Sequence, residues 1–140
     1  MPIDEELIVR KITFINKDIA ELKKLSVLSI KTYLSKADYE VMTERYLERI
    51  IGRMIDVNYH ILSELENYVP TDYYNSFIFL GKKKYLSVKL SESLANSAGL
   101  RNRLAHEYDE IDEKKVFAAI NTCLKDVPKY LKNITKSLNL

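Results

Sequence analysis

Hydrophobic residues recur along most of this chain at alternating intervals of three and four positions, a spacing that places them on one face of an α-helix. The first stripe follows acidic residues near Asp4 that favour a helix start. The second lies between about Asp38 and Tyr68, a helix on the order of 45 Å long that ends before Pro70. The two stripes are Ile8, Ile12, Ile15, Ile19 and Leu22, then Leu47, Ile50, Met54, Val57, Ile61 and Leu65.

Two further helices are predicted in the middle of the chain. The stretch "TDYYNSFIFLG" reads as a short helix that opens at Thr71 or Asp72 and closes at Gly81, with the basic connector "KKKY" after it. Ser87 can cap the next helix, which continues through residue 99 into the segment "RNRLAHEYDE". Its apolar positions are Leu90, Leu94 and Ala98.

The last helix completes a helical bundle. Asp112 can cap it, and Pro128 should kink it without ending it, because the apolar stripe resumes beyond the proline. The pattern contains no strand signal and no internal repeat, so we predict an all-α fold, an antiparallel bundle of four to five helices in one domain over residues 1–140. Apolar flanks on so small a bundle favour a homodimer. The last stripe is Phe117, Ile120, Leu124, Val127, Leu131 and Ile134.

Composition narrows the class of protein. With 46% hydrophobic and 30% charged residues, three Gly and three Pro, the chain is typical of a folded helical protein. The net charge of +2 argues neither for nor against nucleic acid, so any RNA contact must come from a local patch. Cys123 is the single cysteine, which excludes an internal disulfide; it fits a reducing compartment and reads as a small buried hydrophobe.

The chain also carries no obvious membrane signal. Its apolar runs fall short of the roughly 20 residues that span a bilayer, and its start is acidic where a signal peptide is basic. We therefore expect a cytoplasmic protein without a membrane partner.

The segment "RNRLAHEYDE", residues 101–110, concentrates the candidate chemistry. On an ideal helix Asn102 and His106 project within roughly 40° of each other, whereas Arg101 and His106 are about 140° apart. One straight helix therefore does not converge Arg101 and His106 on a small target. Arg101 reaches around the helix, or the helix is distorted near Gly99, or the target lies between two copies of the helix.

The residue types indicate cleavage of RNA without a metal ion. The sequence has no carboxylate cluster for Mg²⁺ and no cysteine set for Zn²⁺, so we expect neither metal nor cofactor. A histidine can move a proton to or from the 2′-hydroxyl or the leaving oxygen, and an arginine can stabilise charge that grows on the phosphate. Such cleavage needs a base and an acid, which two copies of His106 in a two-fold dimer would supply.

Plainer interpretations compete at each position. The spacing alone favours a solvated charged face, in which Arg101 and Arg103 pair with nearby acids and His106 is an ordinary helix histidine. Arg103 and the lysines of the connector are candidates for RNA-backbone contact, although the connector also reads as a solvated turn. His60, alone on its helix, is interpreted as structural. The connector lysines are Lys82, Lys83 and Lys84.

The segment "GLRNRLAHEYDEID" resembles the signature of the HEPN superfamily, and more narrowly of the HepT-like toxins. That motif consists of an arginine, a polar residue, three further residues, a histidine and a tyrosine two residues later. Arg101, Asn102, His106 and Tyr108 fall on these positions without a gap. The helix order over nearly the whole chain is similar too, with the motif on the penultimate long helix and a last helix that begins "ID".

The resemblance implies a homodimeric, metal-independent ribonuclease toxin of a toxin–antitoxin pair. Arg101 and His106 would be catalytic and Asn102 would support them. The antitoxin in that family is a minimal nucleotidyltransferase that transfers AMP from ATP to the motif tyrosine, here Tyr108, and the dimers can assemble further with it. Tyr108 is seven residues after Arg101, about two helical turns, so we expect both on nearly the same face, on the order of 10 Å apart. AMP bound to Tyr108 would then block RNA by charge and bulk. The motif assigns no role to Glu107.

Two other classes of function stay open on the sequence. The first is a non-catalytic helical partner that binds a nucleotide or docks a minimal nucleotidyltransferase, and the second is a plain scaffold bundle. An RNA-cleaving toxin predicts cleavage that is lost in His106→Ala and survives chelation. A docking partner predicts a stable complex without cleavage.

Overall fold

The computed structural model describes residues 2–107 and 109–140, and every regular element in them is an α-helix. In chain order the helices are α1 (Glu5–Ser26), α2 (Ile30–Leu34), α3 (Ala37–Glu66), α4 (Tyr73–Lys82), α5 (Val88–His106) and α6 (Glu113–Leu138). The predicted all-α class is confirmed, and the five predicted helices are all present. The sixth, α2, is the element that periodicity missed, because five residues are too few to show a stripe.

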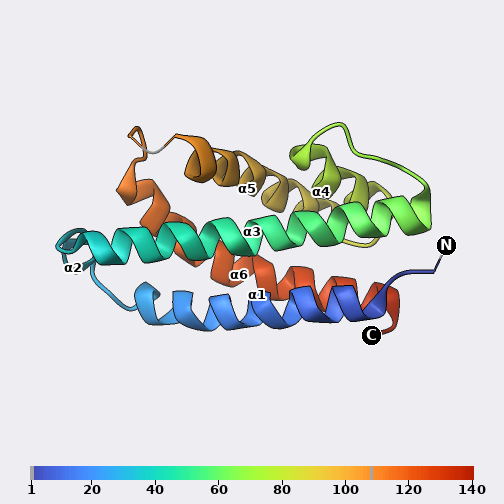
Figure 1. Ribbon diagram of the computed structural model, residues 1–140, viewed down its shortest axis with the longest axis horizontal. Helices are drawn as coiled ribbons and strands as arrows, with labels where there is room; N and C mark the ends of the chain where they lie inside the picture. Colours follow the sequence, from blue (N-terminus) through green and yellow to red (C-terminus); the bar gives the residue numbers. More distant parts are fainter. Residues whose placement is uncertain (1, 108) are drawn as a thin grey trace.

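The long helices α1, α3, α5 and α6 run alternately up and down the molecule (Figure 1). Helix α3 lies along α1 on one side and along α4 and α5 on the other, while α6 packs behind α1 and α3. Helix α1 begins and α6 ends at the same end of the bundle (Figure 1). The antiparallel arrangement follows from the short connections, because a short connection places consecutive helices side by side in opposite directions.

Helix starts match the polar residues that the sequence offers as caps. Asp4, Asp72, Ser87 and Asp112 each accept a backbone N–H from the first turn of α1, α4, α5 and α6, respectively. These side chains satisfy N–H groups that the helix itself leaves without a partner. Helix α6 continues through Pro128 as predicted.

One hydrophobic core joins the five longer helices. It confirms most of the predicted stripes, with Phe117 and Leu124 at its partly buried edge. The prediction that Leu65 belongs to the buried stripe is wrong, because this residue is 41% exposed. The buried face of α3 ends at Leu62, one turn before the helix itself ends.

Two close contacts fix how helices meet. At Gly81, a Cβ atom would lie 2.2 Å from Oγ of Ser91, so α4 and α5 can approach this closely only with glycine there. The prediction that Gly81 closes α4 is wrong by one residue, since the helix runs to Lys82. His60 has the structural role expected of it: its Nε2 accepts the backbone N–H of Asp4 at 2.9 Å and so ties α3 to the start of α1.

Helix α2 is held by a single buried aromatic residue. The Tyr33 ring is fully buried and lies 4.6 Å, centroid to centroid, from that of Phe117 on α6. Its hydroxyl donates to Oε2 of Glu113 at 3.0 Å, in the first turn of α6. Glu44 and Glu40 of α3 lie beside this carboxylate, and burial, with Glu113 and Glu40 adding in the same direction, raises the pKa of Glu44 to about 8.

Candidate functional site: an arginine-lined groove beside the end of helix α5

Helix α5 carries the candidate motif on its last two turns and ends at His106. Glu107 leaves helical geometry, with φ −121° and ψ 64°, and its N–H closes the last turn on the carbonyl of Arg103 at 2.8 Å. The described part of α5 thus ends before Tyr108, so the relation predicted between Arg101 and Tyr108 stays a prediction. Tyr108 itself lies outside the described residues.

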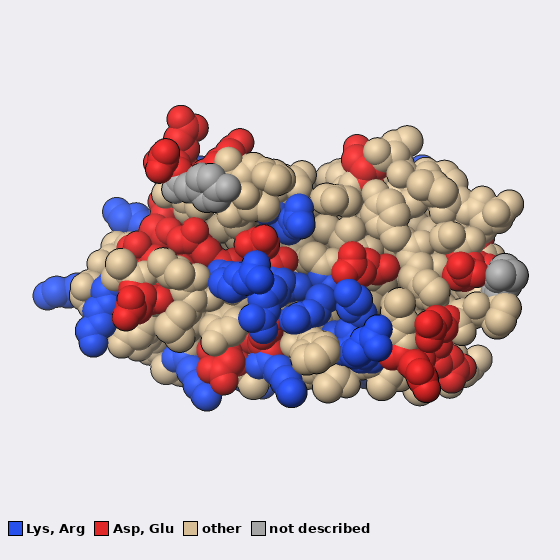
Figure 2. All heavy atoms as spheres, viewed as in Figure 1, with Lys and Arg blue, Asp and Glu red and all other residues tan. Residues whose placement is uncertain are grey.

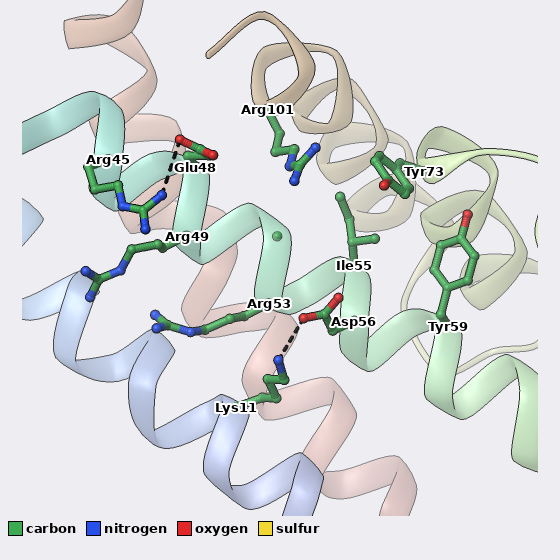
Figure 3. Close-up of a pocket in the computed structure, with 11 residues that line it drawn as sticks. Lys11, Arg45, Glu48, Arg49, Arg53, Ile55, Asp56, Tyr59, Tyr73 and Arg101 are labelled. Atoms are coloured by element: carbon green, nitrogen blue, oxygen red, sulfur yellow. Dashed lines mark hydrogen bonds and ion pairs between the residues drawn. The ribbon is translucent and has the colours of Figure 1, made fainter. Parts of the chain in front are cut away.

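Arg101 turns its side chain into a groove of about 640 Å³ between α1, α3, α4 and α5 (Figure 3). Its guanidinium carbon lies 5.5 Å from the centroid of the Tyr73 ring. Its Nε is buried and has no hydrogen-bond acceptor among the described residues. The Tyr73 ring therefore orients the Arg101 side chain, which forms no ion pair with any residue that the structure describes.

Asn102 and His106 are exposed, and neither lines this groove. Within one chain the structure does not gather Arg101 and His106 around one small cavity. This agrees with the divergence expected from the helical spacing. An active centre shared by two chains stays a prediction.

A row of arginines that the sequence analysis missed lines the groove along α3. Arg45, Arg49 and Arg53 follow one another at intervals of four residues along α3. The signal is visible in "RYLERIIGR", where the repeat of four puts three guanidinium groups on one helix face. Figure 2 shows lysine and arginine side chains gathered over the middle of this face.

Asp18 of α1 holds two of these arginines. Arg49 binds it with two hydrogen bonds, Nε to Oδ2 at 3.0 Å and Nη2 to Oδ1 at 2.6 Å, and Arg53 Nη1 binds Oδ2 at 2.8 Å. The Asp18 side chain is only 3% exposed. A buried carboxylate needs such partners, and the shared pair fixes both guanidinium groups at the groove edge.

The remaining charges of the groove are paired less tightly. Lys11 binds Asp56 at 2.7 Å across α1 and α3, and Arg45 lies 3.7 Å from Glu48 on the same helix (Figure 3). Five basic and two acidic side chains line the groove in all, so its surface is positive. Such a surface suits an anionic ligand.

The other candidate RNA contacts lie elsewhere. Arg103 is exposed beside a smaller pocket between α5 and the start of α6. Lys82 ends α4, and Lys83 and Lys84 lie in the connection to α5. His106 is at the other end of α5, about 27 Å away along the helix at 1.5 Å per residue. Lys83 pairs with Glu66 at 3.6 Å. The structure does not bring these lysines to the motif, and RNA binding by them stays a prediction.

The described residues contain no group of three or more His, Cys, Asp or Glu side chains placed to hold a metal ion. Burial, with Asp126 nearby, raises the pKa of the Cys123 thiol to about 12, so this cysteine is a poor nucleophile at neutral pH. None of the described helices is long and apolar enough to cross a membrane.

Comparison with known proteins decides the family. The family model for HepT-like proteins, described as Ribonuclease HepT-like, matches residues 15–134. The chain belongs to the HepT-like ribonuclease family. This HepT-like chain is 39% identical over 136 residues to the tRNA nuclease HepT of Aphanizomenon flos-aquae, an alignment that covers 97% of this chain and 92% of the relative. The resemblance drawn from the motif is thereby confirmed.

Two further similarities come from Shewanella oneidensis. The mRNA nuclease HepT of that organism is 27% identical over 85 residues, 61% of this chain and 64% of the relative. The solved structure of a tri-AMPylated HEPN toxin in complex with an MNT antitoxin has the same fold, with a TM-score of 0.86 and 22% identity over 95% of this chain and 99% of that one.

Proposed function

We propose that this HepT-like chain, as one domain over residues 1–140, is the endoribonuclease toxin of a cytoplasmic toxin–antitoxin pair and cleaves RNA without a metal ion. The observation that carries the proposal is Arg101, a motif arginine that projects into a positive groove with its Nε unpartnered among the described residues. The 39% identity to a tRNA nuclease over nearly the whole chain supports it. A tRNA or an mRNA is therefore the class of substrate to test first.

The proposed reaction uses the RNA's own 2′-hydroxyl as the nucleophile. His106 accepts the proton of that hydroxyl while its oxygen forms a bond to the adjacent phosphorus. The bond from phosphorus to the 5′-oxygen breaks, and a second histidine donates a proton to the leaving oxygen. Arg101 stabilises the negative charge on the phosphate in the transition state, and Asn102 supports the site. The products are a 2′,3′-cyclic phosphate and a 5′-hydroxyl end.

Two histidines are needed and each chain offers one in the motif, so we place the active centre across the two-fold interface of a homodimer. Co-assembly of wild-type chains with an excess of His106→Ala chains tests this arrangement. A shared centre predicts that the excess of defective chains suppresses cleavage by the wild-type chains. Full activity of the wild-type chains in such mixed dimers would show that each chain has its own centre.

The decisive assay for the activity is cleavage of RNA in the presence of a chelator. The wild type should cleave, and His106→Ala should lose at least about a hundredfold in rate, the usual contribution of general acid–base catalysis. His60→Ala is the matched control, because His60 is the only other histidine and contacts the start of α1 instead. Cleavage that survives His106→Ala, or that chelation abolishes, would refute the proposed chemistry.

We further propose that a minimal nucleotidyltransferase antitoxin neutralises this toxin by transferring AMP from ATP to Tyr108. The family and the AMPylated Shewanella toxin support this assignment. Mass spectrometry of the chain co-expressed with the antitoxin should place AMP on Tyr108, and Tyr108→Phe should stay toxic in its presence. A stable complex with the antitoxin but no cleavage by the purified chain would instead favour the docking-partner alternative.

A further inference from the structure

The arginine row of α3, Arg45, Arg49 and Arg53, lines the same groove as Arg101, and the side chains of Arg49 and Arg53 extend from α3 toward α1 (Figure 3). We propose that this row binds the phosphate backbone of a single RNA strand and guides the strand to Arg101. These arginines are positioning residues and take no part in the chemical step. The inference rests on the proposed ribonuclease function, because it identifies how that site holds its substrate.

The row is rigid before any ligand arrives. Asp18 holds Arg49 by two hydrogen bonds and Arg53 by one. Aromatic rings lie against the same guanidinium groups, with Phe14 at 5.0 Å from Arg53 and Tyr46 at 5.8 Å from Arg49. Cations that are already fixed lose little side-chain entropy when they bind a phosphate, so each contact contributes more to affinity.

The single negative charge of Asp18 does not neutralise all the positive charge of the arginine row. One carboxylate is neutralised by one guanidinium, yet two share it, and the side chain of Arg49 stays 37% exposed. Arg45 does not contact Asp18, and its side chain is 63% exposed, with Glu48 only at 3.7 Å. The row therefore offers positive charge beyond what the fold requires to stabilise its buried acid.

The geometry suits a nucleic-acid strand. Residues four apart rise about 6 Å along a helix, so the three guanidinium groups extend over a length comparable to that of several successive phosphates. Tyr59 and Tyr73 line the same groove, with ring centroids 6.0 Å apart and planes at 81°. Tyr73 is 37% exposed, and such rings offer surfaces on which bases stack. Aromatic rings beside a row of cations favour single-stranded RNA over an acidic peptide.

Binding of a short fluorescently labelled single-stranded RNA to the His106→Ala protein tests the proposal without cleavage. Arg45→Gln together with Arg53→Gln should raise the Kd about tenfold, because hydrogen bonds to charged groups are lost. The slope of log Kd against log salt should decrease by about 0.7 for each arginine removed. The matched control is Lys129→Gln with Lys132→Gln on α6, which removes two exposed charges outside the groove and should leave the Kd within about twofold.

RNA binding by Asp18→Asn distinguishes the effect of fixing the arginine side chains from the effect of their positive charge. The substitution makes the protein more positive, so a purely electrostatic attraction predicts tighter binding of RNA. Loss of the buried anchor predicts weaker binding, because Arg49 and Arg53 are no longer fixed, and weaker binding is the expected result. Thermal unfolding identifies a variant that has lost its fold, and Arg45→Gln, which leaves Asp18 untouched, keeps the test decisive in that case.

In the cleaving protein, Arg45→Gln should raise KM and leave kcat within about twofold, whereas Arg101→Gln should lower kcat. Unchanged RNA affinity in Arg45→Gln with Arg53→Gln would overturn the inference, and so would equal loss in the lysine control. Weakened binding of the antitoxin with unchanged binding of RNA would also overturn it, in favour of a protein ligand. A wild-type protein that binds RNA through the row but never cleaves it would refute the proposed ribonuclease function while supporting RNA binding by the row.

Discussion

The guanidinium carbon of Arg101 lies 5.5 Å from the ring centroid of Tyr73, so the motif arginine of α5 packs against an aromatic ring of α4. The two residues are 28 positions apart in the chain and come together because α4 and α5 form a tight helical pair. A cation over an aromatic ring gains about 0.5–1 kcal/mol at a partly exposed site. That is enough to bias the orientation of Arg101 without neutralising its charge.

Tyr73→Leu should therefore lower kcat/KM for RNA cleavage by about two- to fivefold, since the aromatic face that orients Arg101 is lost. Tyr73→Phe keeps the ring and should cleave within about twofold of the wild type. Steady-state cleavage of one RNA by the three proteins gives the comparison. Equal rates for Tyr73→Leu and the wild type would mean that the ring does not orient Arg101 during catalysis.

The close approach at Gly81 predicts a loss of stability on substitution. Gly81→Ala places a Cβ atom against Ser91 and should reduce the free energy of unfolding by about 1–3 kcal/mol, measured in urea. Gly52→Ala on α3 is the control, because among the described residues no atom outside its own stretch of helix lies within 4 Å of its Cβ position. Helix propensity should make that change stabilising by up to about 1 kcal/mol. Ser91→Gly should partly rescue Gly81→Ala, and the absence of rescue would argue against this contact as the cause.

A buried hydrogen-bond chain links α6, α3 and α4. The Tyr130 hydroxyl donates to Oδ1 of Asn58 at 2.5 Å, and Nδ2 of Asn58 donates to Oγ of Ser76 at 3.1 Å. Tyr130→Phe leaves the Asn58 oxygen without this donor and should cost about 1–2 kcal/mol of unfolding free energy. Tyr74→Phe removes a hydroxyl from a residue that is 47% exposed and should be nearly neutral. A similar loss in both variants would contradict the role assigned to the buried chain.

Glu44 makes stability depend on pH. Its folded pKa of about 8 lies above the ordinary value of 4.5, so between these values the folded chain holds more protons than the unfolded chain. Stability from this group is thus fully present below about pH 4.5 and is lost as pH rises to about 8.

Glu44→Gln cannot ionise and should unfold at a higher temperature than the wild type near pH 9, with a smaller difference near pH 5. The amide also keeps a donor toward Glu113. Thermal unfolding of both proteins across this range measures the effect, and exposed Glu92→Gln controls for the change in net charge. A difference that does not grow with pH would disprove the raised pKa.

Local chemistry in the sequence determined the five longer helices. Asp4, Asp72, Ser87 and Asp112 cap helices through hydrogen bonds to residues two or three positions away, so each start could be predicted from a few neighbouring letters. The alternation of threes and fours likewise reports a single helix face, whatever packs against it. The motif, and with it the family, was readable for the same reason: its residues are adjacent in the chain.

Contacts between residues far apart in the chain determined the position of helix α2 and the formation of the groove. Tyr33 holds α2 in place because its ring packs against Phe117 and its hydroxyl donates to Glu113, both on α6. No local sequence pattern predicts these contacts. The groove exists because Asp18 on α1 binds Arg49 on α3, 31 residues away, and because α4 brings Tyr73 to Arg101. The sequence by itself determined which long helices form and which motif α5 carries, since both depend on neighbouring residues. Only the tertiary structure decided that the arginines of α3 and Arg101 line the same groove, because that depends on how separate helices pack.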